Sequence, residues 1–396
     1  MSAKDSACET PWFGLFERLI DKIGTRRGDP MPGQPRTNRL PSSVYTDPVR
    51  YEAELTHLFR RMPLCLGPVD QFGEGGNVIT REITGLALLI TRDPAGRIRV
   101  FLNACRHRGA RVLTDDSWPC RRTSLSCLYH GWTYGLDGRL LSIPRRDAFP
   151  CLDVEAHALR ELPTTVRHGL IWVVLDRTIK DPPDVAAYLG SVDTDMSALR
   201  VGEHHFFRQT SVLRKANWKL IMDAFVEFYH IKRLHASTIG PFFADSQSVA
   251  DYVGPHQRML VAREGFADVL NLPPKQWDPQ VHGTFEHLIF PNSLIVYHPD
   301  YISHMAVFPA GIDQSLFIHT VSTPELPQDD KARAHWDRSF KLIDEKVFNN
   351  EDLFICEQIQ LALAASAGET FPLGRLEENL LRFHTTIDEL LPATGG

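Results

Sequence analysis

Two pairings of cysteine with histidine constrain the fold of this 396-residue chain more than any other feature of its sequence. Cys105 and His107 form the first pair, and Cys127 and His130 form the second after a spacer of 19 residues. Each pair offers one soft thiolate and one imidazole, and a glycine follows each histidine closely enough to permit a tight loop. Two such loops on adjacent hairpins can converge on one inorganic centre. The fold therefore has to bring the two loops together.

The order of the four ligands indicates which centre they hold. A structural zinc site also uses cysteine and histidine, but its usual order pairs cysteine with cysteine and histidine with histidine. A [2Fe–2S] centre of the Rieske type places two cysteines on one iron and two histidines on the other. Here each loop contributes one ligand to each iron, which favours the iron–sulfur centre and leaves zinc as an alternative.

A second group of metal-ligand residues lies downstream, where His230 is followed by His235. Two neutral histidines and one carboxylate leave positions open on Fe(II) and are typical of non-haem iron oxygenases. On a regular helix a five-residue step places the two rings about 140° apart. Both rings can bind one metal only if the helix ends or makes a π-type turn across residues 231–234.

Asp352 is the candidate third ligand of this second group. It lies beside a helical apolar stripe, so its carboxylate can point toward the core. The stripe consists of Leu353, Cys356, Ile359 and Leu363. Glu351 and Glu357 are the alternative ligands, and either would otherwise lie on a solvated helix face.

These motifs resemble those of the Rieske-type non-haem iron oxygenases, the family of ring-hydroxylating oxygenase alpha subunits. The resemblance covers residues 45–365 and is strongest in runs 103–110 and 127–134, with a further match at Asn217-Trp218-Lys219. It implies that Cys105, His107, Cys127 and His130 hold a [2Fe–2S] cluster. It also implies that His230, His235 and Asp352 hold a mononuclear Fe(II).

The resemblance assigns a separate role to Glu227, three residues before the first histidine ligand. In the family a carboxylate at this position joins that histidine to a cluster histidine of a neighbouring subunit, here His230 and His130. Many members carry aspartate there, so the longer glutamate is a departure from the pattern. Asp223 is a second candidate catalytic residue, for which a supporting or structural role is favoured. Head-to-tail packing of this kind implies a homotrimer.

Apolar and polar periodicity predicts an α+β chain in three parts. We expect a helix at 12–23 and a proline-rich arm in residues 1–44, a β-rich domain at 45–176 and an α+β domain at 177–396. The resemblance identifies the second part with the Rieske [2Fe–2S] domain and the third with the catalytic domain. The resemblance implies that the catalytic domain is helix-grip-like, with an antiparallel sheet and flanking helices. Strands are expected at 86–92, 97–102, 169–175, 206–214, 258–263, 284–290, 293–298, 302–309 and 315–322, and helices at 217–229, 329–365 and 373–391.

Composition excludes several classes of function. The formal net charge is −6, and no long block of lysine and arginine favours nucleic acid. The first 27 residues carry charges and lack the apolar segment of a signal peptide, and the longest apolar runs are too short to span a bilayer. Seven cysteines, an odd number, argue against a disulfide framework. A cytoplasmic protein without a membrane segment is expected.

The resemblance implies a terminal oxygenase that uses O₂ and electrons from NAD(P)H. The electrons would come from a separate flavin-containing reductase, with or without a ferredoxin. Apolar residues near the predicted triad predict a small, partly apolar or aromatic substrate, hydroxylated or demethylated as in aromatic hydrocarbon catabolism. The candidate pocket residues are Met222, Phe225, Phe228 and Phe242.

Three alternatives stay open. Aromatic rings can also enclose a quaternary amine, so a quaternary-amine oxygenase of the same family is the first alternative. An electron-transfer Rieske protein without oxygenase activity is the second. A binding module stabilised by zinc is the third.

Overall fold

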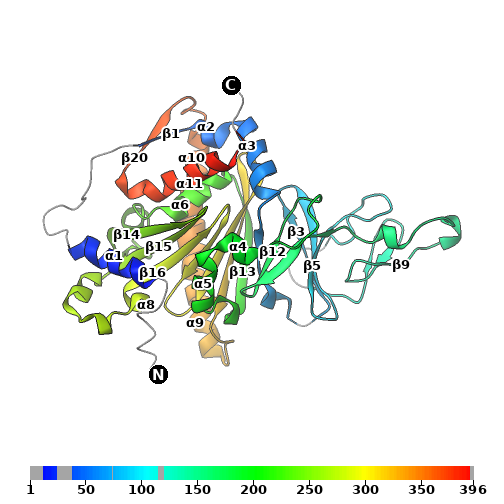
Figure 1. The fold of residues 1–396 in the computed structure, drawn as a ribbon, viewed down its shortest axis with the longest axis horizontal. Helices are drawn as coiled ribbons and strands as arrows, with labels where there is room; N and C mark the ends of the chain where they lie inside the picture. The colour runs from blue at the N-terminus through cyan, green and yellow to red at the C-terminus, as the bar shows by residue number, and fades with distance from the viewer. Residues whose placement is uncertain (1–11, 25–37, 74, 115–119, 393–396) are drawn as a thin grey trace. The chain divides into compact units, whose positions relative to one another are not determined.

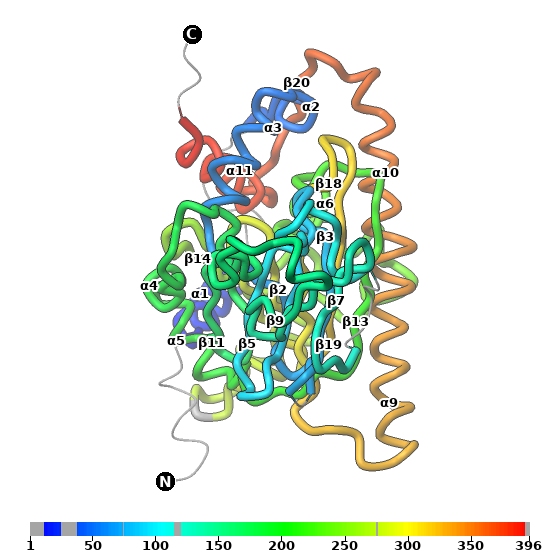
Figure 2. Tube along the Cα trace, turned by 90° about the vertical axis from the view of Figure 1, so that its right-hand side faces the viewer, coloured from blue at the N-terminus to red at the C-terminus, as the bar shows by residue number. Residues whose placement is uncertain are grey.

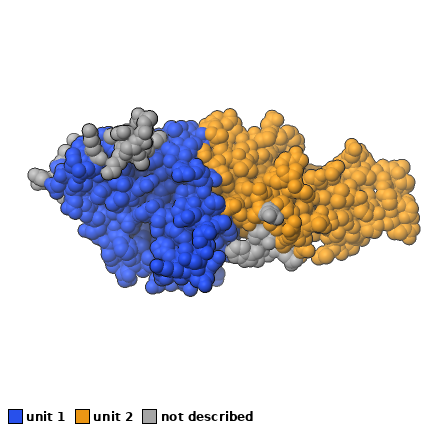
Figure 3. Space-filling view, turned by 90° about the horizontal axis from the view of Figure 1, so that it is seen from below, with its two compact units in different colours: residues 1–58, 189–396 blue, residues 59–188 orange. Residues whose placement is uncertain are grey.

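The computed structural model describes residues 12–24, 38–73, 75–114 and 120–392. The chain forms two compact units, coloured separately in Figure 3: one comprises residues 1–58 and 189–396, and the other residues 59–188. The expected boundaries after residues 44 and 176 therefore differ from those of the compact units. Residues 45–58 belong with the C-terminal part of the chain because their side chains, Glu54 above all, are bonded there.

The unit of residues 59–188 consists almost entirely of short antiparallel strands. One sheet has the order β10-β5-β4-β3-β6, a second the order β11-β12-β2 and a third the order β7-β8-β9. The strands are β2 (Leu64–Pro68), β3 (Asn77–Ile83), β4 (Leu86–Arg92), β5 (Ile98–Leu102), β6 (Cys120–Arg121), β7 (Leu125–Ser126), β8 (Thr133–Tyr134), β9 (Leu140–Ser142), β10 (Glu161–Leu162), β11 (Thr164–Arg167) and β12 (Leu170–Val173). The strands expected at 86–92, 97–102 and 169–175 are confirmed to within two residues at each end.

The other unit is built on a seven-stranded antiparallel sheet of order β13-β19-β18-β17-β16-β15-β14 (Figure 1). Its strands are β13 (His205–Arg214), β14 (Phe243–Val253), β15 (His256–Arg263), β16 (Gly283–Ile289), β17 (Ser293–Tyr297), β18 (Ile302–Gly311) and β19 (Gln314–Thr323). Six of these were expected. The seventh, β14, is half-buried and has no apolar alternation, so its pairing with β15 was not visible in the sequence.

Helices flank this sheet. They are α1 (Phe13–Gly24), α2 (Ser43–Thr46), α3 (Pro48–Glu54), α5 (Ser191–Ala198), α6 (Trp218–Val226), α7 (Ile231–Leu234), α8 (Pro279–His282), α9 (Asp330–Lys341), α10 (Leu353–Ala362) and α11 (Glu378–Leu390), with a π-helix, η11, at Leu342–Asp352. Figure 2 shows α9 and α10 in one long helical column, which η11 joins. No helix among the described residues is both long and apolar enough to cross a membrane.

The N-terminal segment differs in part from expectation. The helix predicted at 12–23 is α1, whose aromatic face packs against β15, β14 and the turn at 266–271. Most of the proline-rich arm lies outside the described residues. Its last part, β1 (Asn38–Pro41), pairs with β20 (Thr370–Leu373) of the same chain.

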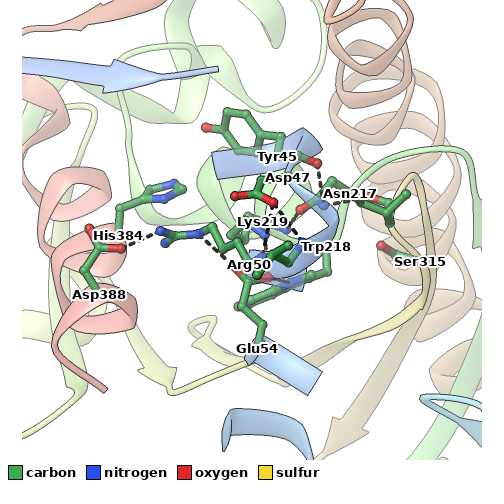
Figure 4. A network of polar contacts seen from close by, with 12 residues as sticks. Tyr45, Asp47, Arg50, Glu54, Asn217, Trp218, Lys219, Ser315, His384 and Asp388 are labelled. Atoms are coloured by element: carbon green, nitrogen blue, oxygen red, sulfur yellow. Dashed lines mark hydrogen bonds and ion pairs between the residues drawn. The ribbon is translucent and has the colours of Figure 1, made fainter. Parts of the chain in front are cut away.

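A buried ionic network ties α3 to α6 (Figure 4). Glu54 accepts hydrogen bonds from Lys219 Nζ (2.6 Å) and Trp218 Nε1 (2.9 Å), and Arg50 Nε reaches its other oxygen at 3.0 Å. Asn217 caps α6 by accepting from the backbone N–H of Lys219. Burial lowers the pKa of Lys219 to about 8, although the ion pair with Glu54 opposes this shift. The Asn217-Trp218-Lys219 motif is thus the anchor of α6.

We expect Glu54→Gln to lower the free energy of unfolding by about 3–5 kcal/mol, because it leaves the Lys219 ammonium buried without its counter-ion. Urea unfolding of the purified protein measures the loss. Glu389→Gln is the matched control, since it breaks a partly exposed pair with Arg382 and should cost less than about 1 kcal/mol. Equal losses in the two variants would contradict the anchoring role of Glu54.

Candidate metal centres

The two cysteine–histidine loops have the same backbone construction. In the first, Gly109 N–H donates to the carbonyl of Cys105 (2.9 Å), and in the second Gly131 N–H donates to the carbonyl of Cys127 (2.9 Å). Both glycines have positive φ, 79° and 69°, which a residue with a side chain adopts only with strain. The loops leave β5 and join β7 to β8, so the sheet arrangement brings them together as expected.

The four side chains of these loops converge. Cys105 and Cys127 are buried in one core cluster with Trp132 and Tyr134. The rings of His107 and His130 lie 4.6 Å apart between centroids, and their Nδ1 atoms are 3.1 Å apart. Two thiols and two imidazole nitrogens that face one another are the donor set of a Rieske cluster, and the loops fit that group.

Burial shifts the pKa values of two of these side chains. It lowers the pKa of His107, and the neighbouring His130 and Arg108 lower it further. Burial also raises the pKa of the Cys127 thiol, and the adjacent Cys105 raises it further. The Tyr134 hydroxyl lies 3.2 Å from Cys105 Sγ and accepts a hydrogen bond from the Arg106 backbone. This tyrosine therefore fixes the first loop against the core.

His230, His235 and Asp352 also come together. Each offers one ligand atom, and these atoms all lie within 4.8 Å of one another. Asp352 Oδ1 lies 3.1 Å from His235 Nε2 and 3.6 Å from His230 Nε2. This buried oxygen has no hydrogen bond of good geometry, so it is an orphaned acceptor that a cation would satisfy. The group therefore fits the facial triad of a mononuclear iron.

Carboxylates hold the outward nitrogens of both histidines. Glu227 Oε1 accepts from His230 Nδ1 at 2.5 Å, and Glu351 Oε2 accepts from His235 Nδ1 at 2.7 Å. With Nδ1 engaged, Nε2 of each ring is left to face Asp352. Burial lowers the pKa of His235, but its bonds to Asp352 and Glu351 outweigh burial and raise it.

The helix break that lets both histidines face one point lies before His230, not between the two histidines as expected. The helix predicted at 217–229 is too long, because α6 ends at Val226 and Glu227 is extended. The Glu227 carboxylate accepts from the backbone N–H of Tyr229, which competes with helical bonding. His230 and His235 then flank the single turn of α7, as its N-cap and C-cap. Their rings come within 5.1 Å between centroids.

Asp352 ends the π-helix η11 and directly precedes α10. The wider π-turns set its carboxylate toward the two histidines, and such turns are frequent at functional sites. Glu351 was an alternative ligand in the sequence, but its carboxylate bonds His235 Nδ1 and the Thr238 hydroxyl instead. Glu357 accepts from the backbone N–H of Lys215.

Asp223 forms its hydrogen bonds with residues outside the triad. Its carboxylate accepts from the Tyr45 hydroxyl (2.6 Å) and from His384 Nε2 (3.0 Å). Burial raises the pKa of Tyr45, and the charge of Asp223 raises it further. These bonds connect α6 to α2 and α11, so Asp223 is a positioning residue of the helix that leads to Glu227.

A cavity of about 90 Å³ adjoins the triad. Its wall is largely apolar and includes Phe225 and Phe228, as expected, together with Phe243. Two expected pocket residues do not line it: Met222 is fully buried in the core, and Phe242 is 51% exposed. Helix α6 places Phe225 in the cavity wall and buries Met222 outside it, a difference the sequence did not reveal.

Sequence reasoning missed three polar residues of this wall, Thr284 and Glu286 on β16 and His298 directly after β17. The only signal in the sequence is a charged residue within an otherwise buried strand. It also missed the hydrogen bond between Glu351 and His235 Nδ1. The position of Glu351 directly before Asp352 was the only indication of this bond in the sequence.

Comparisons with known proteins agree with both centres. Residues 62–158 match the Rieske [2Fe-2S] domain, and residues 200–393 match the ring hydroxylating alpha subunit (catalytic domain). The chain is 28% identical, over 65% of its length, to the glycine betaine monooxygenase oxygenase subunit of Chromohalobacter salexigens, and it spans only 55% of that protein. It is 27% identical to the carnitine monooxygenase oxygenase subunit of Acinetobacter pittii, covering 82% of this chain and 85% of that protein.

A solved structure supports the fold. The quaternary ammonium Rieske monooxygenase in complex with L-carnitine superposes with a TM-score of 0.73 at 20% identity. The superposition covers 89% of this chain and 96% of that one. At this identity the likeness concerns the fold alone.

We expect Asp352→Ala to lose the mononuclear metal and keep the cluster, because only the triad loses a ligand. Iron and sulfide analysis, with the visible absorbance of the cluster, measures both. Glu357→Ala, on the adjoining helix α10, is the control and should retain all the iron. Undiminished iron in Asp352→Ala would remove this residue from the ligand set.

Glu351→Ala should weaken iron binding about 10- to 100-fold, as loss of a carboxylate behind a ligating histidine usually does. Competition with a chelator gives the affinity. Thr238→Val, which removes the other partner of Glu351 and leaves the bond to His235, should change it much less. An unchanged affinity in Glu351→Ala would show that His235 needs no such support.

Proposed function

Because the chain belongs to the family of Rieske oxygenase alpha subunits, we propose that it is the terminal component of a multicomponent monooxygenase that acts on a small quaternary ammonium compound. The observation that carries the oxygenase assignment is the triad of His230, His235 and Asp352 beside a largely apolar cavity. The proposed substrate class rests on the names of the relatives, glycine betaine and carnitine monooxygenase subunits.

The residues divide the work between the two centres. When bound, the [2Fe–2S] cluster supplies single electrons, and the mononuclear iron supplies the chemistry that activates O₂. Cys105, His107, Cys127 and His130 hold the cluster. His230, His235 and Asp352 would hold the iron, and all three line the cavity in which the substrate would bind. The apolar wall excludes water from the reacting C–H bond.

Glu227 is the proposed link between centres of neighbouring subunits. Its Oε1 already accepts from His230 Nδ1, and Oε2 bonds the backbone N–H of Tyr229. In a head-to-tail homotrimer the carboxylate would also accept from the imidazole of His130 of the neighbouring subunit, which is an exposed side chain in this chain. Such a bridge would orient both ligands.

Electrons would come from NAD(P)H through a separate flavin-containing reductase, with or without a ferredoxin. The electron-carrier alternative has no use for the triad and its cavity. The aromatic substrate favoured by the sequence is supported by the apolar wall, but the relatives favour the quaternary-amine alternative.

The function is tested by turnover with a promiscuous reductase, NADH and O₂. Quaternary ammonium compounds should give a product that has gained one oxygen or lost a methyl group as formaldehyde, detected by mass and formaldehyde assay. Aromatic acids and neutral rings are the comparison set. Turnover of the aromatic set alone would overturn the proposed substrate class.

We expect Glu227→Gln to keep both metal centres yet slow the reoxidation of the reduced cluster about 10- to 100-fold in a single turnover. The neutral amide supports the two imidazoles less well than a carboxylate. Glu264→Gln, a change in an exposed pair with Lys232, is the control and should react at the wild-type rate. A wild-type rate in Glu227→Gln would exclude the bridging role.

A further inference from the structure

Glu286 is a buried carboxyl group without a partner. Its residue is 6% exposed, and its Oε1 is a buried atom with no hydrogen bond. No ion pair or hydrogen bond to Glu286 is present among the described residues. Burial of an unpaired carboxyl costs several kcal/mol, so a stable fold does not retain one without reason.

The other buried acidic residues show how unusual this is. Seven acidic side chains are buried among the described residues, and six of them face a basic group. These six are Glu54 with Lys219, Asp93 with Arg99, Asp195 with Arg258, Asp223 with His384, Asp344 with His319, and Asp352 with His235. Glu286 alone faces none.

The strand register directs Glu286 into the cavity beside the triad. Glu286 lies opposite Met259 on β15 and Val296 on β17, in the interior of the sheet. Its neighbour in the chain, His287, points to the other face, where it bonds Asp195 and the Tyr297 hydroxyl. Alternation along the strand therefore places Glu286 and Thr284 on the face that lines the cavity.

No cationic side chain of the described cavity wall is paired with this carboxyl: His230 and His235 line the wall too, but their nitrogens face Asp352 and the carboxylates of Glu227 and Glu351. No lysine or arginine lies in its described wall. A further histidine of the wall, His298, directly follows β17, and burial lowers its pKa to about 3, so it is neutral. Phenylalanine rings at 225, 228 and 243 form much of the rest. An acidic group among aromatic rings is complementary to a cation, because the cation can form an ion pair with the carboxylate and cation–π contacts with the rings.

We propose that Glu286 is the counter-ion that selects a substrate with a positively charged nitrogen and holds it beside the triad. This inference rests on the proposed oxygenase function and names the residue that determines its substrate class. A neutral aromatic molecule would leave the carboxyl unpaired and gain nothing from it. Burial raises the pKa of Glu286 well above its usual range, and a bound cation would supply the missing charge.

The test uses pairs of ligands that differ only in charge. Choline pairs with 3,3-dimethylbutanol, and glycine betaine pairs with 3,3-dimethylbutanoate, because a quaternary carbon replaces the nitrogen at nearly the same volume. Anaerobic titration calorimetry of the metal-loaded protein gives the affinity for each member. In the wild-type protein the ammonium member of at least one pair should bind about 10- to 100-fold more tightly.

Glu286→Gln should abolish that difference and leave the affinity for uncharged 3,3-dimethylbutanol unchanged. Thr284→Val is the matched control on the same strand and face. It removes a hydroxyl but no charge, so the preference for the ammonium should survive. Glu286→Leu, an apolar replacement of similar size, serves if the amide variant loses its metals or its fold.

The outcomes separate this inference from the proposed function. A wild-type protein with no preference for the ammonium member of any pair overturns the role of Glu286, as does a preference that persists in both Glu286 variants. In either case turnover of any of these ligands would still support the oxygenase. Tight, Glu286-dependent binding of a cation that is never oxidised would support Glu286 and contradict the proposed function.

Discussion

Carboxylate–imidazole hydrogen bonds are the interaction on which the catalytic unit depends. An imidazole can present either nitrogen to a metal, and nothing in a histidine itself selects one. Glu227 and Glu351 occupy Nδ1 of His230 and His235, and so turn Nε2 of both rings toward Asp352. The helix break after Val226 and the π-helix before Leu353 are the backbone features that bring these carboxylates within reach.

Buried charge recurs through this unit and is almost always paired. The Glu54–Lys219 pair anchors the start of α6, and Asp223 joins the same helix to α2 and α11. Removing charges from water is costly, so these pairs favour one arrangement of their helices over alternatives that would leave a charge alone. Glu286 is the exception among the described residues, because each of the other buried acidic side chains faces a basic group.

The two centres are built on different principles. The cluster loops depend on backbone geometry, with a positive-φ glycine closing each turn and the thiols packed into a core. The triad depends on side-chain hydrogen bonds from elements far apart in the chain, at positions 227–235 and 351–352. A local motif therefore describes the first centre almost completely, whereas the second exists only when the sheet and the late helices have packed.

The sequence by itself determined the chemistry of the chain. Cys105, His107, Cys127 and His130 lie in short motifs whose spacing sets loop geometry, and strands such as β4 and β16 follow from local apolar runs. The tertiary structure decided in which direction individual side chains point. Helix α6 buries Met222 in the core and places Phe225 in the cavity, and strand register directs Glu286 inward. Half-buried β14 forms because β15 lies beside it. A sequence carries residue type and local period, but long-range packing chooses which face each side chain occupies.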